Sequence, residues 1–154
     1  MIVVEPTTPR ANGTQDLLEL SHALMFSLFS PESCHFLDLD ALEADNIHLF
    51  AAREGQDMLG TGALAIKDGY GEVKSMFTLE AARGKGVAAA LLRQIEDTAR
   101  EHNLPKLRLE TGDTLHAAHR LYERHSFTFC APFGDYKDIP ESLFMEKDLT
   151  EATP

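Results

Sequence analysis

The order of apolar and polar residues predicts one strand and two helices in the N-terminal third of the chain. Ile2-Val-Val-Glu5 is typical of a strand, and Pro6 ends it. Apolar residues then recur at helical spacing after Thr14, whose hydroxyl can cap a helix, until Ser30-Pro31 ends the run. A second, short helix is predicted around residues 40–44.

An antiparallel meander is predicted for the middle of the chain. Its three strands cover residues 47–53, 58–67 and 72–78. Turn residues separate these strands at Glu54-Gly-Gln-Asp57 and at Asp68-Gly-Tyr-Gly71. A loop is expected to follow at residues 79–85.

Helices and strands alternate in the C-terminal half. The first helix follows the loop and carries apolar residues at helical spacing, namely Ala88, Leu91, Leu92, Ile95 and Ala99. Asn103 and Pro105 end that helix. A strand at 107–111, a helix at about 114–125 and strands near Thr128 and at 142–149 complete the pattern. The whole order predicts an α/β fold with a mixed, mostly antiparallel sheet flanked by about four helices.

Composition limits the classes of protein to consider. A length of 154 residues with 44 % apolar residues fits one packed domain, residues 1–149, followed by a short tail at 150–154. The formal net charge of −11 disfavours nonspecific binding to nucleic acid or to anionic membranes. No apolar run approaches the ~20 residues of a membrane span, and no signal peptide is expected. Cys34 and Cys130 lack metal-ligand spacing, so we expect two free thiols in a cytoplasmic protein.

One segment, Ser75 to Leu92, carries the candidate chemistry. It indicates a strand, a loop with Gly84 and Gly86, and then a helix. The free amides of the first helical turn favour an anion such as a pyrophosphate, and Arg83 and Lys85 add positive charge. The three-glycine spacing of a Rossmann loop is absent, and Lys85 is followed by Gly86 and not by the Ser or Thr of a phosphate loop.

Two segments resemble signatures of the GNAT superfamily of acetyltransferases. Arg83-Gly-Lys-Gly-Val-Ala88 is similar to the Arg/Gln-x-x-Gly-x-Gly/Ala loop, and Leu121-Tyr-Glu-Arg-His-Ser-Phe127 to the later Leu-Tyr-x-x-x-Gly-Phe segment. The segments Gly71–Phe77 and Pro132–Tyr136 resemble a bacterial subgroup of small N-acetyltransferases. The order of elements fits the superfamily from residue 2 to 149, so the resemblance implies the GNAT fold, with the pyrophosphate loop between a central strand and the next helix.

The chain departs from the family pattern at two places. Thr114-Leu-His116 stands where many members have an asparagine that contacts the cofactor, and Ser126 stands in place of a glycine. We expect the second change to alter the turn after the helix without abolishing activity.

The resemblance implies that acetyl-CoA is the co-substrate and that no metal is needed. Amides of the loop and of the following helical turn would hold the pyrophosphate. The backbone of the preceding strand would hold the pantetheine arm and polarise the thioester carbonyl. The implied cofactor-binding residues are Met76, Phe77, Thr78, Arg83, Gly84, Lys85, Gly86, Val87 and Ala88.

Tyr122 and Glu72 are the implied catalytic residues. Tyr122 would protonate the leaving thiolate, since a phenol has a reference pKa of ~10 and keeps its proton at neutral pH. Glu72 would deprotonate the acceptor amine, and Glu110 is a second candidate for that base. Strict alternation would place Glu72, Lys74 and Met76 on one face of their strand.

The favoured activity is acetyl transfer to an amine of a small molecule by direct attack in a ternary complex, because neither cysteine lies in a nucleophile motif. A non-catalytic acyl-CoA sensor and an enzyme acting on a protein amine remain alternatives, and a homodimer is left open. The resemblance places four aspartates around the acceptor cleft, where they would favour a cationic acceptor; the alternative is that they are ordinary solvated loop residues. These are Asp38, Asp40, Asp135 and Asp138. His116, His119 and His125 are expected on a solvated helix face.

Overall fold

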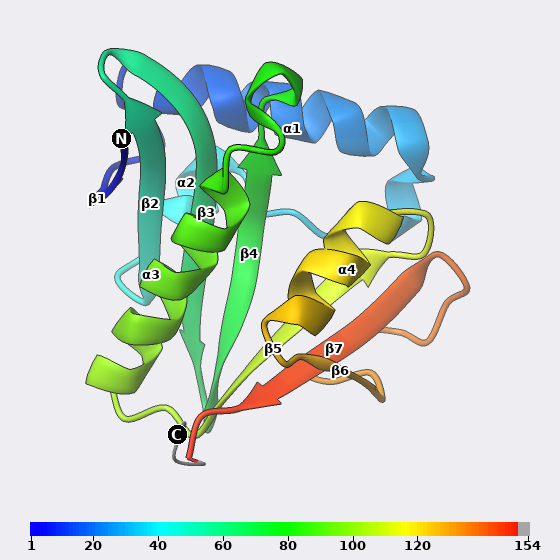
Figure 1. Cartoon of the computed structure of the whole chain (residues 1–154). Coiled ribbons are helices and arrows are strands. Elements are labelled where there is room, and N and C mark those ends of the chain that lie inside the picture. The colour runs from blue at the N-terminus through cyan, green and yellow to red at the C-terminus, as the bar shows by residue number, and fades with distance from the viewer. Residues whose placement is uncertain (151–154) are drawn as a thin grey trace.

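Residues 1–150, which the computed structural model describes, form one seven-stranded sheet and four α-helices (Figure 1). The strands are β1 (Ile2–Pro6), β2 (Ile47–Glu54), β3 (Asp57–Lys67), β4 (Tyr70–Thr78), β5 (Lys106–Gly112), β6 (Thr128–Cys130) and β7 (Ser142–Asp148). The helices are α1 (Thr14–Leu28), α2 (Leu39–Leu42), α3 (Val87–Glu101) and α4 (His116–Arg124), with 3₁₀ turns at Pro31–Ser33 and Glu80–Ala82. The predicted fold class is confirmed. The predicted tail at 150–154 lies, apart from Thr150, outside the described residues.

The sheet opens at its centre. Its strand order is β1-β2-β3-β4-β5-β7-β6, and only the β4–β5 pair is parallel. That pair is short, because Gly71 lies opposite Leu107 and Glu72 opposite Arg108 before the strands diverge. Figure 1 shows β4 and β5 spreading into a V from that point. The backbone of β4 beyond Glu72 is therefore unpaired on its β5 side among the described residues.

Helices cover both faces of this sheet. The apolar side of α3, with Leu91, Leu92 and Ile95 fully buried, packs on the main core, and α4 lies on the same face over β5 and β7 (Figure 1). Leu18 of α1 packs with a second, smaller cluster that includes Leu42 of α2 on the other face. Burial of each such leucine contributes about 1.5–3 kcal/mol to stability. The helices packed on the two faces of the sheet therefore hold β4 and β5 in their diverging arrangement. None of the helices within residues 1–150 is long and apolar enough to cross a membrane.

Two helix starts differ from expectation. Thr14 does not cap α1, because Gly13 takes the N-cap position at φ 82° and Thr14 is fully buried with its hydroxyl 2.9 Å from that of Thr7. The short α2 begins earlier than predicted, at Leu39, because the Asp38 side chain accepts a hydrogen bond from the amide of Ala41.

Candidate active site

A bulge in β4 lies where the sheet opens. The register with β3 shifts between Thr61 and Ala63, so that Ser75 and Met76 both stand opposite Gly62. Ser75 has φ 56°, an uncommon value for a residue with a side chain, and its carbonyl accepts a hydrogen bond of 2.8 Å from the Thr61 hydroxyl. Because of this extra residue, the side chains of β4 after the bulge point to the opposite faces of the sheet from those that strict alternation predicts.

The bulge overturns the expected alternation along β4. A Cβ added to Gly62 would lie 2.8 Å from the Met76 sulfur and 3.1 Å from Ile95 of α3. Met76 therefore faces α3, on the opposite side from Glu72 and Lys74. The expectation that Glu72, Lys74 and Met76 share one face is wrong for Met76.

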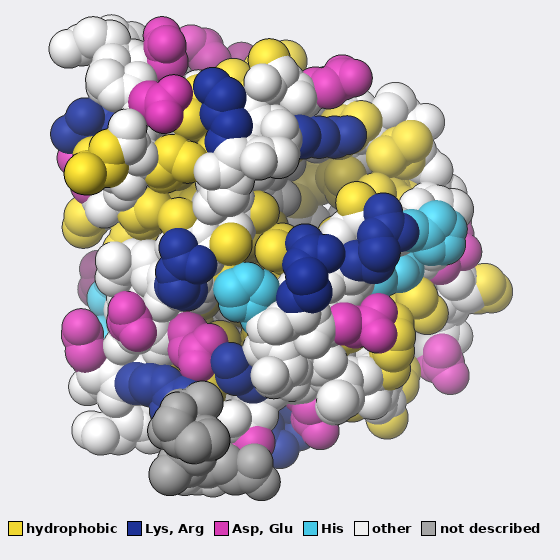
Figure 2. All heavy atoms as spheres, viewed as in Figure 1, with side chains coloured by type: hydrophobic (Ala, Val, Ile, Leu, Met, Phe, Trp, Pro, Cys, Tyr) yellow, Lys and Arg dark blue, Asp and Glu magenta, His cyan; other side chains and the backbone are white. Residues whose placement is uncertain are grey.

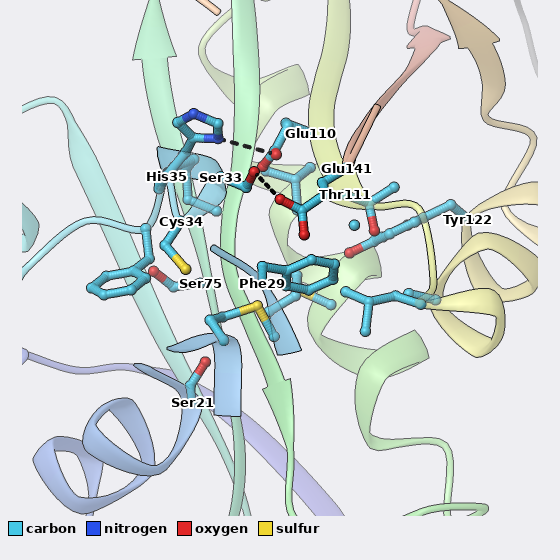
Figure 3. A pocket seen from close by; sticks show the side chains of 18 residues that line it. Ser21, Phe29, Ser33, Cys34, His35, Ser75, Glu110, Thr111, Tyr122 and Glu141 are labelled. Atoms are coloured by element: carbon cyan, nitrogen blue, oxygen red, sulfur yellow. Dashed lines mark hydrogen bonds and ion pairs between the residues drawn. The ribbon is translucent and has the colours of Figure 1, made fainter. Parts of the chain in front are cut away.

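A cavity of about 140 Å³, called the inner cavity below, lies in the V beside the bulge (Figure 3). Its walls come from α1, the 33–36 segment, β4, β5 and the start of α4. Residues lining it include Met25, Phe29, Cys34, His35, Phe36, Ser75, Met76, Glu110, Leu115, Tyr122 and Glu141. The inner cavity is lined by Tyr122, Met76 and Glu110 together, but not by Glu72, the other catalytic residue that the resemblance implies.

Tyr122 reaches the inner cavity from α4 (Figure 3). The residue is only 6 % exposed, and its ring packs against Phe127 at 5.7 Å between centroids. Its hydroxyl has no hydrogen-bond partner within residues 1–150. Burial raises the pKa of Tyr122 above its ordinary value of 10, so the phenol keeps its proton. A protonated, unpartnered hydroxyl at this place can donate to a ligand.

The loop before α3 is open to an anion. Gly84 and Gly86 adopt φ 84° and 83°, and a Cβ added to either would meet nothing within 4 Å. No side chain caps the first turn of α3, so its amides are free to bind a ligand. Arg83 and Lys85 are exposed beside it. This arrangement fits a pyrophosphate, and Figure 2 shows Lys and Arg side chains bordering a hollow between the positions of α3 and α4.

Two carboxylates face the inner cavity. Glu110 of β5 has a side chain that is 14 % exposed, and its Oε2 lies 3.2 Å from His35 Nδ1 and accepts a 2.8 Å hydrogen bond from the Ser142 hydroxyl. Glu141 Oε1 accepts hydrogen bonds from the hydroxyls of Ser30 and Ser33, at 2.7 and 2.6 Å. These bonds hold the pKa of Glu141 below its usual range.

Glu72 lies in different surroundings. It is 4 % exposed and lines a second, larger cavity of about 690 Å³, the outer cavity. The Tyr136 hydroxyl donates to Glu72 Oε2 at 2.5 Å, and Lys74 Nζ lies 3.5 Å from the same oxygen. Lys74 Nζ also donates to the Tyr136 hydroxyl and to the His35 carbonyl, at 2.7 and 2.8 Å. Burial is the main reason that the pKa of Tyr136 is raised.

The two cavities adjoin. His35, Phe36 and Lys74 line both of them, whereas Glu72 lines only the outer cavity and Tyr122 only the inner one. Tyr122 therefore shares a cavity with Glu110 and not with Glu72.

The expected convergence of aspartates is wrong. Asp38 caps α2, and Asp40 pairs with Arg10 at the surface. Asp138 lines neither cavity, and only Asp135 reaches the outer one. A helix cap engages the side chain of Asp38, and a surface ion pair engages that of Asp40.

The prediction of a solvated histidine face is also wrong for His119. That residue is 8 % exposed, and its Nε2 lies 2.8 Å from the carbonyl of Gly112 at the end of β5. It fixes α4 against the strand. Within residues 1–150, no three His, Cys, Asp or Glu side chains are grouped to hold a metal ion.

Comparison with known proteins identifies the family. The profile of the Acetyltransferase (GNAT) family matches residues 15–127. An IAA acetyltransferase of Azospirillum brasilense is 39 % identical over 150 residues, covering 96 % of this chain and 98 % of that protein. YsnE of Bacillus subtilis, an uncharacterized N-acetyltransferase, is 40 % identical over 132 residues, covering 83 % and 87 %.

Solved structures agree with this result. A candidate acyl-CoA N-acyltransferase from Klebsiella pneumoniae superposes with a TM-score of 0.84 at 30 % identity, covering 97 % of this chain and 98 % of that one. The fold, the match to the family profile and the relatives agree over most of the sequence. The chain therefore belongs to the GNAT family and is an acetyltransferase.

Proposed function

We propose that the enzyme transfers the acetyl group of acetyl-CoA to an amine of a small molecule, by direct attack in a ternary complex. The observation that carries this proposal is the unpartnered hydroxyl of the buried residue Tyr122, which lines a cavity beside the free edge of β4. A GNAT acetyltransferase from Elizabethkingia anophelis, similar in fold with a TM-score of 0.67 at 18 % identity, was solved with acetyl-CoA bound.

In this proposal the cofactor follows the loop and the strand edge. Amides of residues 84–88 bind the pyrophosphate, with Arg83 and Lys85 adding positive charge. The unpaired backbone of Met76, Phe77 and Thr78 binds the pantetheine arm, as an added strand would, and directs the thioester toward the inner cavity.

The chemistry needs an acid, a base and no enzyme nucleophile. The amine nitrogen attacks the thioester carbonyl, the C–N bond forms and the C–S bond breaks, and Tyr122 protonates the departing thiolate. Burial raises the pKa of Cys34, which lines the inner cavity, so this cysteine stays a thiol and a poor nucleophile. Direct attack is therefore favoured over an acyl-enzyme.

The shape of the site favours a small acceptor. The bonds of Ser30 and Ser33 to Glu141 join the end of α1 to the loop before β7 across the inner cavity. A folded protein surface would need this bridge to open, whereas a small amine fits beneath it.

The test is an assay of CoA thiol release with purified enzyme, acetyl-CoA and a panel of amines, amino acids and N-terminal peptides, with mass spectrometry of the products. We expect acetylated small amines. Binding of acetyl-CoA by calorimetry without thiol release for any acceptor would indicate a sensor. Acetylation of peptides alone would indicate a protein acetyltransferase.

A further inference from the structure

Glu72 and Glu110, the two candidate bases, differ in the hydrogen-bond and ion-pair partners of their carboxylates. Glu72 Oε2 accepts the Tyr136 hydroxyl at 2.5 Å and lies 3.5 Å from the Lys74 ammonium. This oxygen is thus already engaged by a phenol hydroxyl and an ammonium group of the chain itself. Glu72 also lines only the outer cavity, whereas Tyr122 lines only the inner one.

Glu110 has the properties that Glu72 lacks. Both of its contacts fall on Oε2, one from the neutral Ser142 hydroxyl and one from His35, and Oε1 has no partner within residues 1–150. No Lys or Arg of the described residues lies within ion-pair distance of Glu110. Glu110 lines only the inner cavity, which Tyr122 also lines.

His35 holds this carboxylate in place. Its ring meets the Tyr136 ring edge-on at 5.1 Å, and its carbonyl accepts the hydrogen bond from Lys74. Tyr136 and Lys74 thus fix His35, and His35 fixes Glu110 through Nδ1. The buried network around Glu72 is therefore connected to Glu110 through His35.

A second carboxylate completes the surroundings of an amine. The hydroxyls of Ser30 and Ser33 both bind Glu141 Oε1, and Oε2 accepts no hydrogen bond within residues 1–150. Glu110, Glu141 and Tyr122 therefore line one small cavity (Figure 3). Two negative groups and an unpartnered donor suit an ammonium group beside a thioester.

We propose that Glu110, oriented by His35 and Ser142, is the general base, and that the acceptor is an amine that arrives protonated and is held between Glu110 and Glu141. This inference rests on the proposed function. One proton passes from the ammonium nitrogen to Glu110 and then to solvent, and the nitrogen lone pair forms the C–N bond. The nitrogen loses its second proton as the C–S bond breaks, and that proton replaces the one that Tyr122 gives to the thiolate.

The test compares benzylamine, an ammonium ion at neutral pH, with aniline, which is neutral there and one methylene shorter. Glu110→Gln keeps the size of the side chain and an oxygen for Ser142 but cannot take a proton. We expect kcat/KM for benzylamine to fall by about 10²-fold or more, and the benzylamine-to-aniline ratio to fall at least about tenfold. Glu72→Gln lowers both amines alike, and Glu123→Gln, an exposed change on α4, is the charge-matched control.

His35 is a positioning residue and needs its own readout. His35→Asn keeps a donor near the place of Nδ1 and is expected to retain the amine ratio, whereas His35→Ala lowers it as Glu110→Gln does. An unchanged ratio in Glu110→Gln, or a lowered ratio in Glu72→Gln, would overturn the assignment. A wild-type enzyme that binds acetyl-CoA but acetylates no amine of the panel described above, benzylamine and aniline included, would refute the proposed function itself.

Discussion

Removal of the Tyr136 hydroxyl tests the buried network on which the site rests. Tyr136→Phe deletes a donor to Glu72 and an acceptor for Lys74, at 2.5 and 2.7 Å. A hydrogen bond to a charged group contributes about 1.5–3 kcal/mol. Glu72 keeps Lys74 at 3.5 Å and Lys74 keeps the His35 carbonyl, so the loss is smaller than the sum. We expect the free energy of unfolding to fall by about 3 kcal/mol, which lowers Tm by roughly 6–12 °C in a chain of this size.

Urea unfolding followed by circular dichroism measures this change. The midpoint should fall while the slope m stays constant, because the unfolded surface is the same. Tyr70→Phe is the matched control, because Tyr70 lines the same outer cavity and its hydroxyl forms no hydrogen bond within residues 1–150. That control should stay within about 0.5 kcal/mol of wild type. A loss below about 1 kcal/mol for Tyr136→Phe would refute the view that this hydroxyl joins two buried charges.

Four further changes have defined outcomes. Tyr122→Phe should lower kcat roughly 10²-fold with acetyl-CoA affinity unchanged, and a thiol-release rate within about twofold of wild type would contradict its role as acid. Arg83→Glu should weaken acetyl-CoA binding in calorimetry while the far-ultraviolet dichroism stays the same. Gly112→Ala would place a Cβ 2.1 Å from the Phe29 ring, so we expect a stability loss of about 1–3 kcal/mol in urea and a lower kcat/KM. Burial lowers the pKa of His22 below its usual 6.5, so the unfolded chain binds more protons just below that pH. Stability should therefore decrease as pH falls from 6.5 through the folded pKa, and His22→Gln should flatten that decrease in urea titrations at pH 7.5 and 5.5.

The elements around the cofactor loop follow from local sequence. The apolar period from Ala88 to Ala99 predicts α3, and Gly84 and Gly86 mark the loop because their positive φ values are ones that glycine adopts without strain. A helix start and the loop before it lie within a few residues of each other. Their geometry therefore depends little on the rest of the fold.

The bulge in β4 is a different case. Val73-Lys-Ser-Met-Phe77 contains no glycine and alternates like a regular strand, yet Ser75 takes φ 56°. The shift depends on pairing with β3, where Gly62 leaves room for the Met76 sulfur. Alternation of residues in one strand does not indicate a bulge, because the bulge depends on the pairing with the neighbouring strand. The face predicted for Met76 is wrong for that reason.

Apart from Glu110, which the sequence offers as a second candidate base, the acceptor side of the site could not be predicted, because its contacts join distant parts of the chain. His35 meets Glu110 across 75 residues, and Ser33 meets Glu141 across 108. No local spacing signals such pairs, and both loops contain ordinary polar residues that a sequence alone assigns to solvent.

The cofactor loop and the acceptor side of the site also differ in charge. A chain of net charge −11 gives no sign of a basic anion site, yet exposed Arg83 and Lys85 stand beside the uncapped turn of α3. Glu110 and Glu141 face the inner cavity on the other side of the V, where an ammonium would approach. The fold thus separates positive charge for the cofactor from negative charge for the acceptor. Because local geometry sets the first and tertiary packing the second, substitutions in the 33–36 segment should change acceptor choice more than affinity for acetyl-CoA.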